Sequence, residues 1–523
     1  MKSTLAVLLA NMGFVLQISG IFLLIPIVAS FIFEETNATI ALFLTATAFL
    51  ILGFFANSLC ERKSMTFKQS CALIVLVFVL LSLIGSIPYL YIGVSSGDPL
   101  LHITDCIFES VSGFTTTGFT IIPDITVLPQ SIILYRSLTQ FIGGMGIVVV
   151  LLAFFYPEAK LREFAKSMGL NQNNHKIKKT FLFIIGVYCI VTALMVLIAY
   201  GFGYHDLIAL SSIIFSAVST GGFSPVNDIG GLLTQPPFNV IIPFCMFFAA
   251  SNLVVLAKLY KKNFREFIDS ETTAFLIIAG IATVLVITVF NFPSYDAGFH
   301  VLSALSTSGF SYTAVGELND SLKLFLVALM FIGGASFSTA GGIKIYRFLL
   351  VAKSVPKTVA FTIVGKDDKN CKVHLFSKNY SNSEVVQASI MIFLTAIVIF
   401  VSAGIVSYYG YQPVNALFDC TSAMCTTGLC TGVVGPSLAL ELKWLFMFLM
   451  LLGRVEIIVF LVAISRTKEK RCRNNHAADV KEKEEEPQET ETAEEEAKAD
   501  EKHDVKREKW KSRFVSFLKT HTL

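Results

Sequence analysis

Long apolar segments separated by short polar ones run along residues 1–466. An apolar run of about 18 residues or more crosses the hydrocarbon core as a helix and is too long for a barrel strand. We therefore expect about ten spanning helices, the first of them a retained span rather than a cleaved signal peptide. They lie near residues 5–33, 38–58, 69–93, 131–156, 180–203, 237–257, 272–291, 322–351, 386–408 and 442–465.

Weaker apolar segments lie between the members of each later pair of spans, and each is too short or too polar to span twice. These segments are 101–118, 205–222, 297–309 and 413–428. We expect each to enter the membrane as a half-helix and to return as an extended loop. Such backbone is tolerated at that depth only where protein buries it or where it lines a wet cavity.

The predicted fold class is an all-α integral membrane protein, with four tandem helix–pore loop–helix repeats in pseudo-fourfold symmetry. Two additional transmembrane helices precede the repeats, in residues 1–67. The repeats cover 68–157, 158–266, 267–385 and 386–466, and a charged cytosolic tail covers 467–523. The third repeat includes an interrupted inner helix and a cytosolic linker.

Each re-entrant segment ends in the same motif, which reads FTTTGFT, VSTGGFS, LSTSGFS and MCTTGLC. The aligned glycines follow a threonine by two places and a serine by six places; the serines are Ser112, Ser216, Ser303 and Ser422. Four copies of a polar, glycine-bearing turn indicate one structural role repeated around an axis. A ring of backbone carbonyls around a dehydrated cation fits that role. The alternative is that small residues merely allow helices to approach closely.

Backbone carbonyls replace water around K⁺ without a full charge, so the ion can still leave. Glycine permits the backbone angles that such a loop needs, and a half-helix C-terminus favours a cation. The predicted ion filter comprises Thr116, Thr117, Gly118, Thr220, Gly221, Gly222, Thr307, Ser308, Gly309, Thr426, Thr427 and Gly428. Among these, K⁺ is expected at Thr116, Gly118, Thr220, Gly222, Thr307, Gly309, Thr426 and Gly428.

The span at 322–351 is long, and four glycines break its middle. Hydroxyl side chains there can satisfy the freed backbone groups. This pattern predicts a loop that blocks ions and moves aside, although a kinked packing helix is the alternative. The loop residues of the predicted gate are Gly333, Gly334, Ser336, Ser338, Thr339, Gly341, Gly342 and Lys344. An equal alternative for Lys344 is an ordinary basic residue that flanks the cytoplasmic end of the span.

Charge sets the orientation. The connections near residues 62–68, 160–179, 258–265 and 344–378 are basic, whereas the alternate ones are acidic or neutral. Because cytoplasmic loops carry the excess of Lys and Arg, both termini are expected in the cytoplasm and the four loops enter from outside. In the tail, Trp510, Phe514, Phe517 and Leu518 share one helical face that suits an anionic membrane surface; an ordinary disordered end is the alternative.

Composition excludes other classes. The chain is 54% hydrophobic and 15% charged, and its net charge of +3 averages unlike regions and gives no indication of nucleic-acid binding. The sequence has no phosphate-binding GxxxxGK[ST] or Rossmann motif, so no enzyme is expected. The spans hold no catalytic constellation, with His300 alone near the outer face, and the cysteines lack zinc-site spacing. We expect no bound cofactor, with K⁺ only as the transported ion.

The loops resemble those of the TrkH, KtrB and HKT superfamily of potassium transporters. Residues 109–118, ESVSGFTTTG, resemble the first pore loop, and 333–344, GGASFSTAGGIK, resemble the segment that interrupts the third inner helix. Residues 453–456, GRVE, resemble the fourth inner helix. The resemblance covers about 68–466, and the two leading helices favour the TrkH branch.

The resemblance implies a Trk-type potassium uptake subunit in the plasma membrane, or in the inner membrane of a cell with two membranes. With glycine at all four filter positions, it implies potassium permeability. It also implies a homodimer among membrane lipid and a cytosolic ring of nucleotide-binding regulatory subunits of the TrkA type. Arg454 is placed below the filter, where its charge raises the barrier to cations; a structural ion pair is the alternative. A cation symporter of the same superfamily, moving K⁺ with Na⁺ or H⁺, is the alternative function.

Several residues depart from the family pattern or leave their role open. Phe337 stands where relatives often carry glycine, and the second inner helix reads AASN at 249–252 instead of a glycine pair. Glu109 and Asp419 each lie nine residues before their glycine. These two acids either attract cations or anchor the pore helices, and we favour anchoring.

Overall fold

The computed structural model describes residues 2–58, 66–93, 99–154, 174–227, 229–252, 270–364, 373–376 and 378–465. The charged tail and its predicted membrane-surface helix lie outside the described residues, as does most of the basic connection at 160–179. The described helices belong to one unit, Met1–Ile464.

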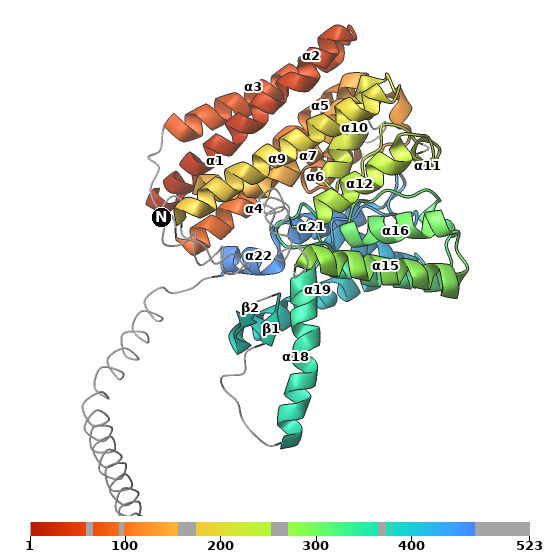
Figure 1. The fold of residues 1–523 in the computed structure, drawn as a ribbon. Coiled ribbons are helices and arrows are strands. Elements are labelled where there is room, and N and C mark those ends of the chain that lie inside the picture. Colours follow the sequence, from red (N-terminus) through yellow and green to blue (C-terminus); the bar gives the residue numbers. More distant parts are fainter. Residues whose placement is uncertain are drawn as a thin grey trace, which may run out of the picture. The chain divides into compact units, whose positions relative to one another are not determined.

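Three N-terminal helices precede the repeats: α1 (Lys2–Phe22), α2 (Leu24–Ile32) and α3 (Thr36–Ser58). α1 and α3 run side by side at one edge of the bundle (Figure 1). Glycines allow this contact, because a Cβ on Gly13 would lie 2.5 Å from the Gly53 carbonyl oxygen. Small residues let apolar helices approach within the membrane.

Each of the four repeats contains an outer helix, a pore helix and an inner helix. The outer helices are α4 (Phe67–Gly85) with α5 (Ile87–Ile92), α9 (Asn174–Gly201), α15 (Glu271–Phe290) and α19 (Asn382–Tyr408). The pore helices are α6 (Pro99–Phe114), α10 (Leu207–Val218), α16 (Ser294–Ser306) and α20 (Pro413–Met424). The inner helices are α7 (Gln130–Phe154), α12 (Phe238–Ala250), α17 (Asp320–Ile332) with α18 (Ile345–Val364), and α21 (Leu440–Val455) with α22 (Ile457–Ile464).

The pore helices close the repeats into a ring. Each packs against the inner helix of its own repeat and that of the preceding repeat: α6 against α7 and α21, α10 against α12 and α7, α16 against α17 and α12, and α20 against α21 and α17. The contact of α6 with α21 joins the first repeat to the last. The predicted fold, four helix–loop–helix repeats after two N-terminal transmembrane helices, is confirmed, because α1 and α2 together form one span, Leu8–Ile32, and α3 forms the other.

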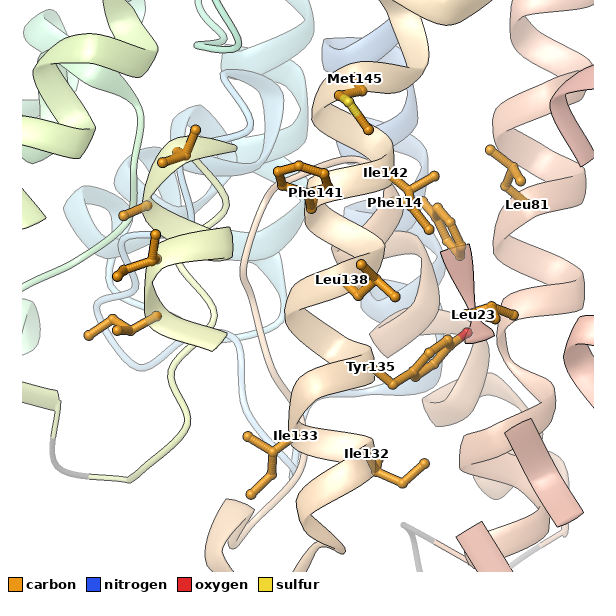
Figure 2. Close-up of a cluster of buried hydrophobic side chains, with 14 of the residues drawn as sticks. Leu23, Leu81, Phe114, Ile132, Ile133, Tyr135, Leu138, Phe141, Ile142 and Met145 are labelled. Carbon is orange, nitrogen blue, oxygen red and sulfur yellow. The ribbon is translucent and has the colours of Figure 1, made fainter. Parts of the chain in front are cut away.

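The first inner helix, α7, is buried on several sides. Figure 2 shows Tyr135, Leu138 and Met145 along it, with Leu81 and Phe114 contributed by other helices. The Tyr135 hydroxyl donates to the Gly85 carbonyl at 2.7 Å. The outer helix α15 instead exposes large apolar side chains, among them Ile277, Ile281 and Val284. Such a surface is stable against lipid rather than water.

Five described helices are long and apolar enough to span a membrane, or six if the bent pair α21 and α22 is counted as one. Two predicted spans were wrong in detail. The helix expected at 442–465 ends at Val455, and α22 departs at 98°, because Glu456 adopts a φ of 70° and breaks the helix. The helix expected at 237–257 ends at Ala250, where Ser251 becomes extended.

The described linker of the third repeat contains a small departure from an all-helical fold. β1 (Val373–Leu375) and β2 (Lys378–Tyr380) pair antiparallel, with Val373 opposite Tyr380. Buried Val373, Leu375 and Tyr380 pack with Leu350 of α18 and Val385 of α19. The hairpin therefore covers the junction between the third and fourth repeats.

Candidate ion-conducting site

All four pore helices end in the same backbone turn. The threonine two places before each glycine adopts a left-handed conformation, with φ of 55° at Thr116, 53° at Thr220, 53° at Thr307 and 49° at Thr426. In the first repeat, the Thr117 N–H donates to the Ser112 carbonyl at 3.0 Å and the Thr116 N–H donates to the Gly113 carbonyl at 2.9 Å. The other three repeats make the equivalent pair of bonds. This is a Schellman helix end, and its threonine replaces the usual glycine.

The four aligned glycines meet in one ring. A Cβ on Gly118 would lie 2.1 Å from the Gly221 oxygen, and one on Gly222 would lie 3.0 Å from the Ser308 oxygen. A Cβ on Gly309 would lie 2.3 Å from the Thr427 oxygen, and one on Gly428 would lie 2.0 Å from the Thr117 oxygen. Each glycine thus abuts the carbonyl that precedes the next glycine, and the fourth returns to the first. All four glycines also have positive φ, a conformation that other residues adopt only with strain, and at Gly118, Gly309 and Gly428 the neighbouring oxygen leaves no space for a Cβ.

The threonine hydroxyls of the ring are buried but are not equivalent. The Thr307 hydroxyl accepts from the Gly341 N–H at 2.6 Å, and the Thr220 hydroxyl donates to the Ser219 carbonyl. The hydroxyls of Thr116 and Thr426 have no hydrogen-bond partner within the described residues. Unpaired buried oxygens are costly unless a ligand satisfies them.

Glu109 and Asp419 anchor the rising loops. Glu109 accepts from the Thr120 hydroxyl at 3.1 Å, and Asp419 accepts from the Thr431 N–H at 2.8 Å. The same register in the third repeat holds His300, whose Nε2 lies 3.3 Å from the Thr313 hydroxyl oxygen. His300, for which the sequence offered no catalytic partner, thus joins the pore helix to the following loop as the two acids do.

Sequence reasoning missed two residues of α7 that hold the loops. Arg136 donates to Glu109 at 2.6 Å, donates to the Ser224 carbonyl at 3.3 Å and lies 4.2 Å from the Phe223 ring centre. Gln140, one turn later, contacts the second loop. The signal was present in the sequence, because an arginine and a glutamine inside an apolar span usually have a polar partner.

The third inner helix is interrupted at the predicted place. α17 ends at Ile332, Gly333 takes a φ of 72°, and α18 begins at Ile345. The Ala335 N–H donates to the Ala250 carbonyl at 2.9 Å, and the Thr339 N–H donates to the Ala249 carbonyl at 3.1 Å. The early end of α12, in the AASN segment, therefore leaves carbonyls free to bind the loop.

The interrupting loop, residues 333–344, contacts the inner ends of three pore helices. The Thr339 hydroxyl donates to the Val218 carbonyl at 3.2 Å, beside the second pore helix. Gly341 binds Thr307 of the third, and a Cβ on Gly341 would lie 1.9 Å from the Cys425 oxygen of the fourth. The loop thus lies against the C-terminal ends of these pore helices, from which the glycine-bearing loops continue.

The remaining predicted gate residues lie within the loop or beside it. Gly342 packs against Gly333, and the Gly334 carbonyl accepts from the Ile345 N–H. The Ser338 hydroxyl donates to the Ala335 carbonyl. The Ser336 hydroxyl is buried without a partner within the described residues, although its N–H donates to Glu271. Lys344 donates to the Ala340 carbonyl, so it is part of the loop rather than a free flank.

Arg454 binds backbone carbonyls. It donates to the Thr339 oxygen at 3.1 Å and to the Gly143 oxygen at 2.7 Å, and it is 7% exposed. Glu456 pairs instead with Arg347 of α18, at 2.9 Å. Within the described part of the chain, Arg454 forms no ion pair with a carboxylate, so its positive charge lies uncompensated beside the loop.

A helical membrane bundle that brings four glycine-bearing loops into one ring, with the Arg454 guanidinium and a loop beside the C-terminal ends of its pore helices, is the architecture of a membrane cation transport protein. The chain belongs to the TrkH family, described as cation transport proteins, whose family model matches residues 94–471. An uncharacterized cation transporter of Methanocaldococcus jannaschii is 30% identical over 90% of this chain and 98% of its own length.

Other relatives carry a more specific name. The Trk system potassium uptake protein TrkH of Escherichia coli is 27% identical over 78% of this chain and 87% of its own length. The crystal structure of the potassium transporter TrkH from Vibrio parahaemolyticus matches with a TM-score of 0.77 and 22% identity, covering 88% of this chain and 99% of that one. The latter similarity concerns the fold.

Proposed function

We propose that this chain conducts K⁺ into the cell through a pore at the centre of its four repeats, driven by membrane potential. The observation that carries the proposal is the ring of Gly118, Gly222, Gly309 and Gly428, each against the carbonyl before the next glycine. Carbonyl rings replace the hydration shell of a cation without binding it irreversibly. The potassium uptake named for TrkH relatives supports K⁺ as the ion.

The loop at 333–344 is the gate in this proposal. Its support is the contact of Thr339 and Gly341 with three pore helices, at their C-terminal ends. Arg454 adds a positive charge that raises the barrier to a cation while the loop is in place. One loop in each quarter favours a pore over alternating access between two halves.

A cytosolic regulatory subunit of the TrkA type would move this gate, and the chain would work as a homodimer with both termini in the cytoplasm. The relatives are named as parts of a Trk system, which supports a partner. α18 begins where the loop ends and packs against β1 of the linker hairpin, so a partner that binds there can pull on the loop (Figure 1).

Flux in liposomes tests the proposal. Purified protein is reconstituted, and the influx of K⁺, Rb⁺, Na⁺ and Li⁺ is compared at a fixed potential, with Gly222→Asp as the matched non-conducting variant. We expect K⁺ and Rb⁺ to pass and Na⁺ and Li⁺ to be excluded. Equal influx of all four ions would overturn the selectivity, and a strict requirement for a Na⁺ or proton gradient would establish the symporter instead.

A further inference from the structure

The four loops differ at the residue before the ring glycine. This residue is Thr117, Gly221, Ser308 or Thr427, so only the second loop lacks a side-chain hydroxyl there. In the first repeat the Thr117 hydroxyl lies 2.8 Å from that of Thr115. In the third repeat the Ser308 hydroxyl lies 2.8 Å from that of Ser306. These pairs stiffen the first and third loops from within, whereas the Thr427 hydroxyl of the fourth loop has no partner within the described residues.

Gln140 of α7 occupies the space that the missing side chain would need. A Cβ on Gly221 would lie 2.3 Å from both Cδ and Oε1 of Gln140. The Gln140 amide donates from Nε2 to the Gly221 carbonyl at 2.6 Å, and its Oε1 accepts from the Phe223 N–H at 3.3 Å. One side chain therefore brackets Gly222 on both sides.

The inner helices also differ at one position, where only the first carries a hydrogen-bond donor. Aligned on the segments QFIGGMG, MFFAASN, MFIGGAS and MLLGRVE, Gln140 corresponds to Met246, Met330 and Met450. A thioether cannot donate a hydrogen bond. Within the described residues, the equivalent ring carbonyls of Thr117, Ser308 and Thr427 accept no hydrogen bond, so only the Gly221 carbonyl is held by a side chain.

We propose that Gln140 is a positioning residue for cation selectivity, which fixes the Gly221 carbonyl from outside the loop in place of the internal hydroxyl. The inference rests on the proposed pore. The bond uses part of the electron density of one ring oxygen and restrains its orientation. Because selectivity depends on the number, field strength and rigidity of the coordinating carbonyls, a ring with one restrained oxygen discriminates differently from a ring with four free ones.

The proposal is tested by replacing the Gln140 amide with a hydroxyl inside the second loop. Gln140→Met gives α7 the residue of the other inner helices and removes the donor. Gln140→Glu keeps the shape and, when ionised, cannot donate to the carbonyl. Gly221→Ser alone clashes with Gln140. The double variant Gln140→Ala with Gly221→Ser makes room and gives the second loop the Ser-Thr-Ser-Gly sequence of the third, since Ser219 is already present.

The measurement is the reversal potential of the reconstituted protein between K⁺ and Na⁺ solutions, which gives a permeability ratio that does not depend on the amount of protein. We expect Gln140→Met and Gln140→Glu to lower the K⁺ to Na⁺ ratio by about fivefold, the effect of one hydrogen bond. The double variant should return to within about twofold of the wild-type ratio, because the two sites are coupled.

Met330→Ala is the matched control, since it removes volume at the same register of the third repeat without removing a donor. Its ratio should equal that of the wild type. A wild-type ratio in both Gln140 single variants would overturn the role of Gln140, and so would an equal loss in Met330→Ala, which would indicate packing alone. A wild-type protein without K⁺ selectivity would instead overturn the proposed function itself.

Discussion

Glu109 of the first pore helix and Arg136 of the first inner helix form an ion pair, with 2.6 Å between Oε1 and Nη2 and with each side chain 1% exposed. Removing one partner leaves the other charge buried. We expect Glu109→Gln to destabilise the protein by about 3–5 kcal/mol. Thermal unfolding in detergent measures this, with exposed Glu317→Gln as the control. Equal midpoints for the two variants would contradict the prediction.

The glycines of the ring differ in how closely the next carbonyl approaches. A Cβ would lie 2.0 Å from its neighbour at Gly428 and 2.1 Å at Gly118, but 3.0 Å at Gly222. We expect Gly428→Ala and Gly118→Ala to abolish rubidium uptake and Gly222→Ala to retain a measurable part of it. Positive φ adds about 1–2 kcal/mol of strain in each variant.

The control for the ring is Gly404→Ala in α19, where a Cβ meets nothing within 4 Å. Its rubidium uptake should match the wild type at equal expression. Greater uptake by Gly428→Ala than by Gly222→Ala would show that the ring is not assembled in this way.

Gly341 allows the loop to lie against the fourth pore helix. A Cβ there would lie 1.9 Å from the Cys425 oxygen and 2.5 Å from the Thr426 hydroxyl oxygen. A Cβ cannot fit this close to the Cys425 carbonyl, which is held at the end of a packed helix. Gly341→Ala should therefore displace the loop and break its bond to Thr307. We expect faster rubidium influx into liposomes without any partner protein. Gly280→Ala, in open space, should leave the rate unchanged, and a slower rate in Gly341→Ala would refute a blocking role for the loop.

Arg454 places a positive charge beside the loop, where it pairs with no carboxylate of the described residues. Glutamine can still donate to the Thr339 or Gly143 carbonyl but carries no charge. We expect Arg454→Gln to raise basal rubidium influx by about tenfold or more, since a full charge near the path raises the barrier for a cation. Arg454→Lys retains the charge and should keep the rate low. Similar rates in the two variants would show that the charge does not set the barrier.

Phe337 adopts a φ of 56°, a conformation that favours glycine. Alanine at this position removes the phenyl ring but keeps the backbone strain of the positive φ. Glycine removes both the phenyl ring and the strain. We therefore expect Phe337→Gly to be more stable than Phe337→Ala by about 1 kcal/mol, the reverse of the usual order. Thermal unfolding of the two variants gives the comparison, and a more stable alanine variant would count against a strained loop.

The sequence predicted much of the architecture because its signals are local. Apolar runs determine which segments enter a bilayer, and a repeated serine, threonine and glycine spacing determines a repeated helix end. The glycines around 333–342 predicted the break in the third inner helix, because glycine interrupts a helix locally. Conversely, the residues around Glu456 gave no turn signal, and at the bend Glu456 pairs with Arg347, 109 residues away.

Gln140 and Gly221 are 81 residues apart, and nothing in either segment indicates that they touch. The order of the loops around the ring also depends on contacts between distant segments. So do the bonds of the third-repeat loop to the α12 carbonyls and the position of Arg454, which among the described residues meets backbone carbonyls and no carboxylate. Chain chemistry by itself determined which segments enter the membrane and how each turns. Only the tertiary structure decided which polar groups meet, because a buried hydrogen bond joins whatever packing brings within about 3 Å, regardless of separation along the chain.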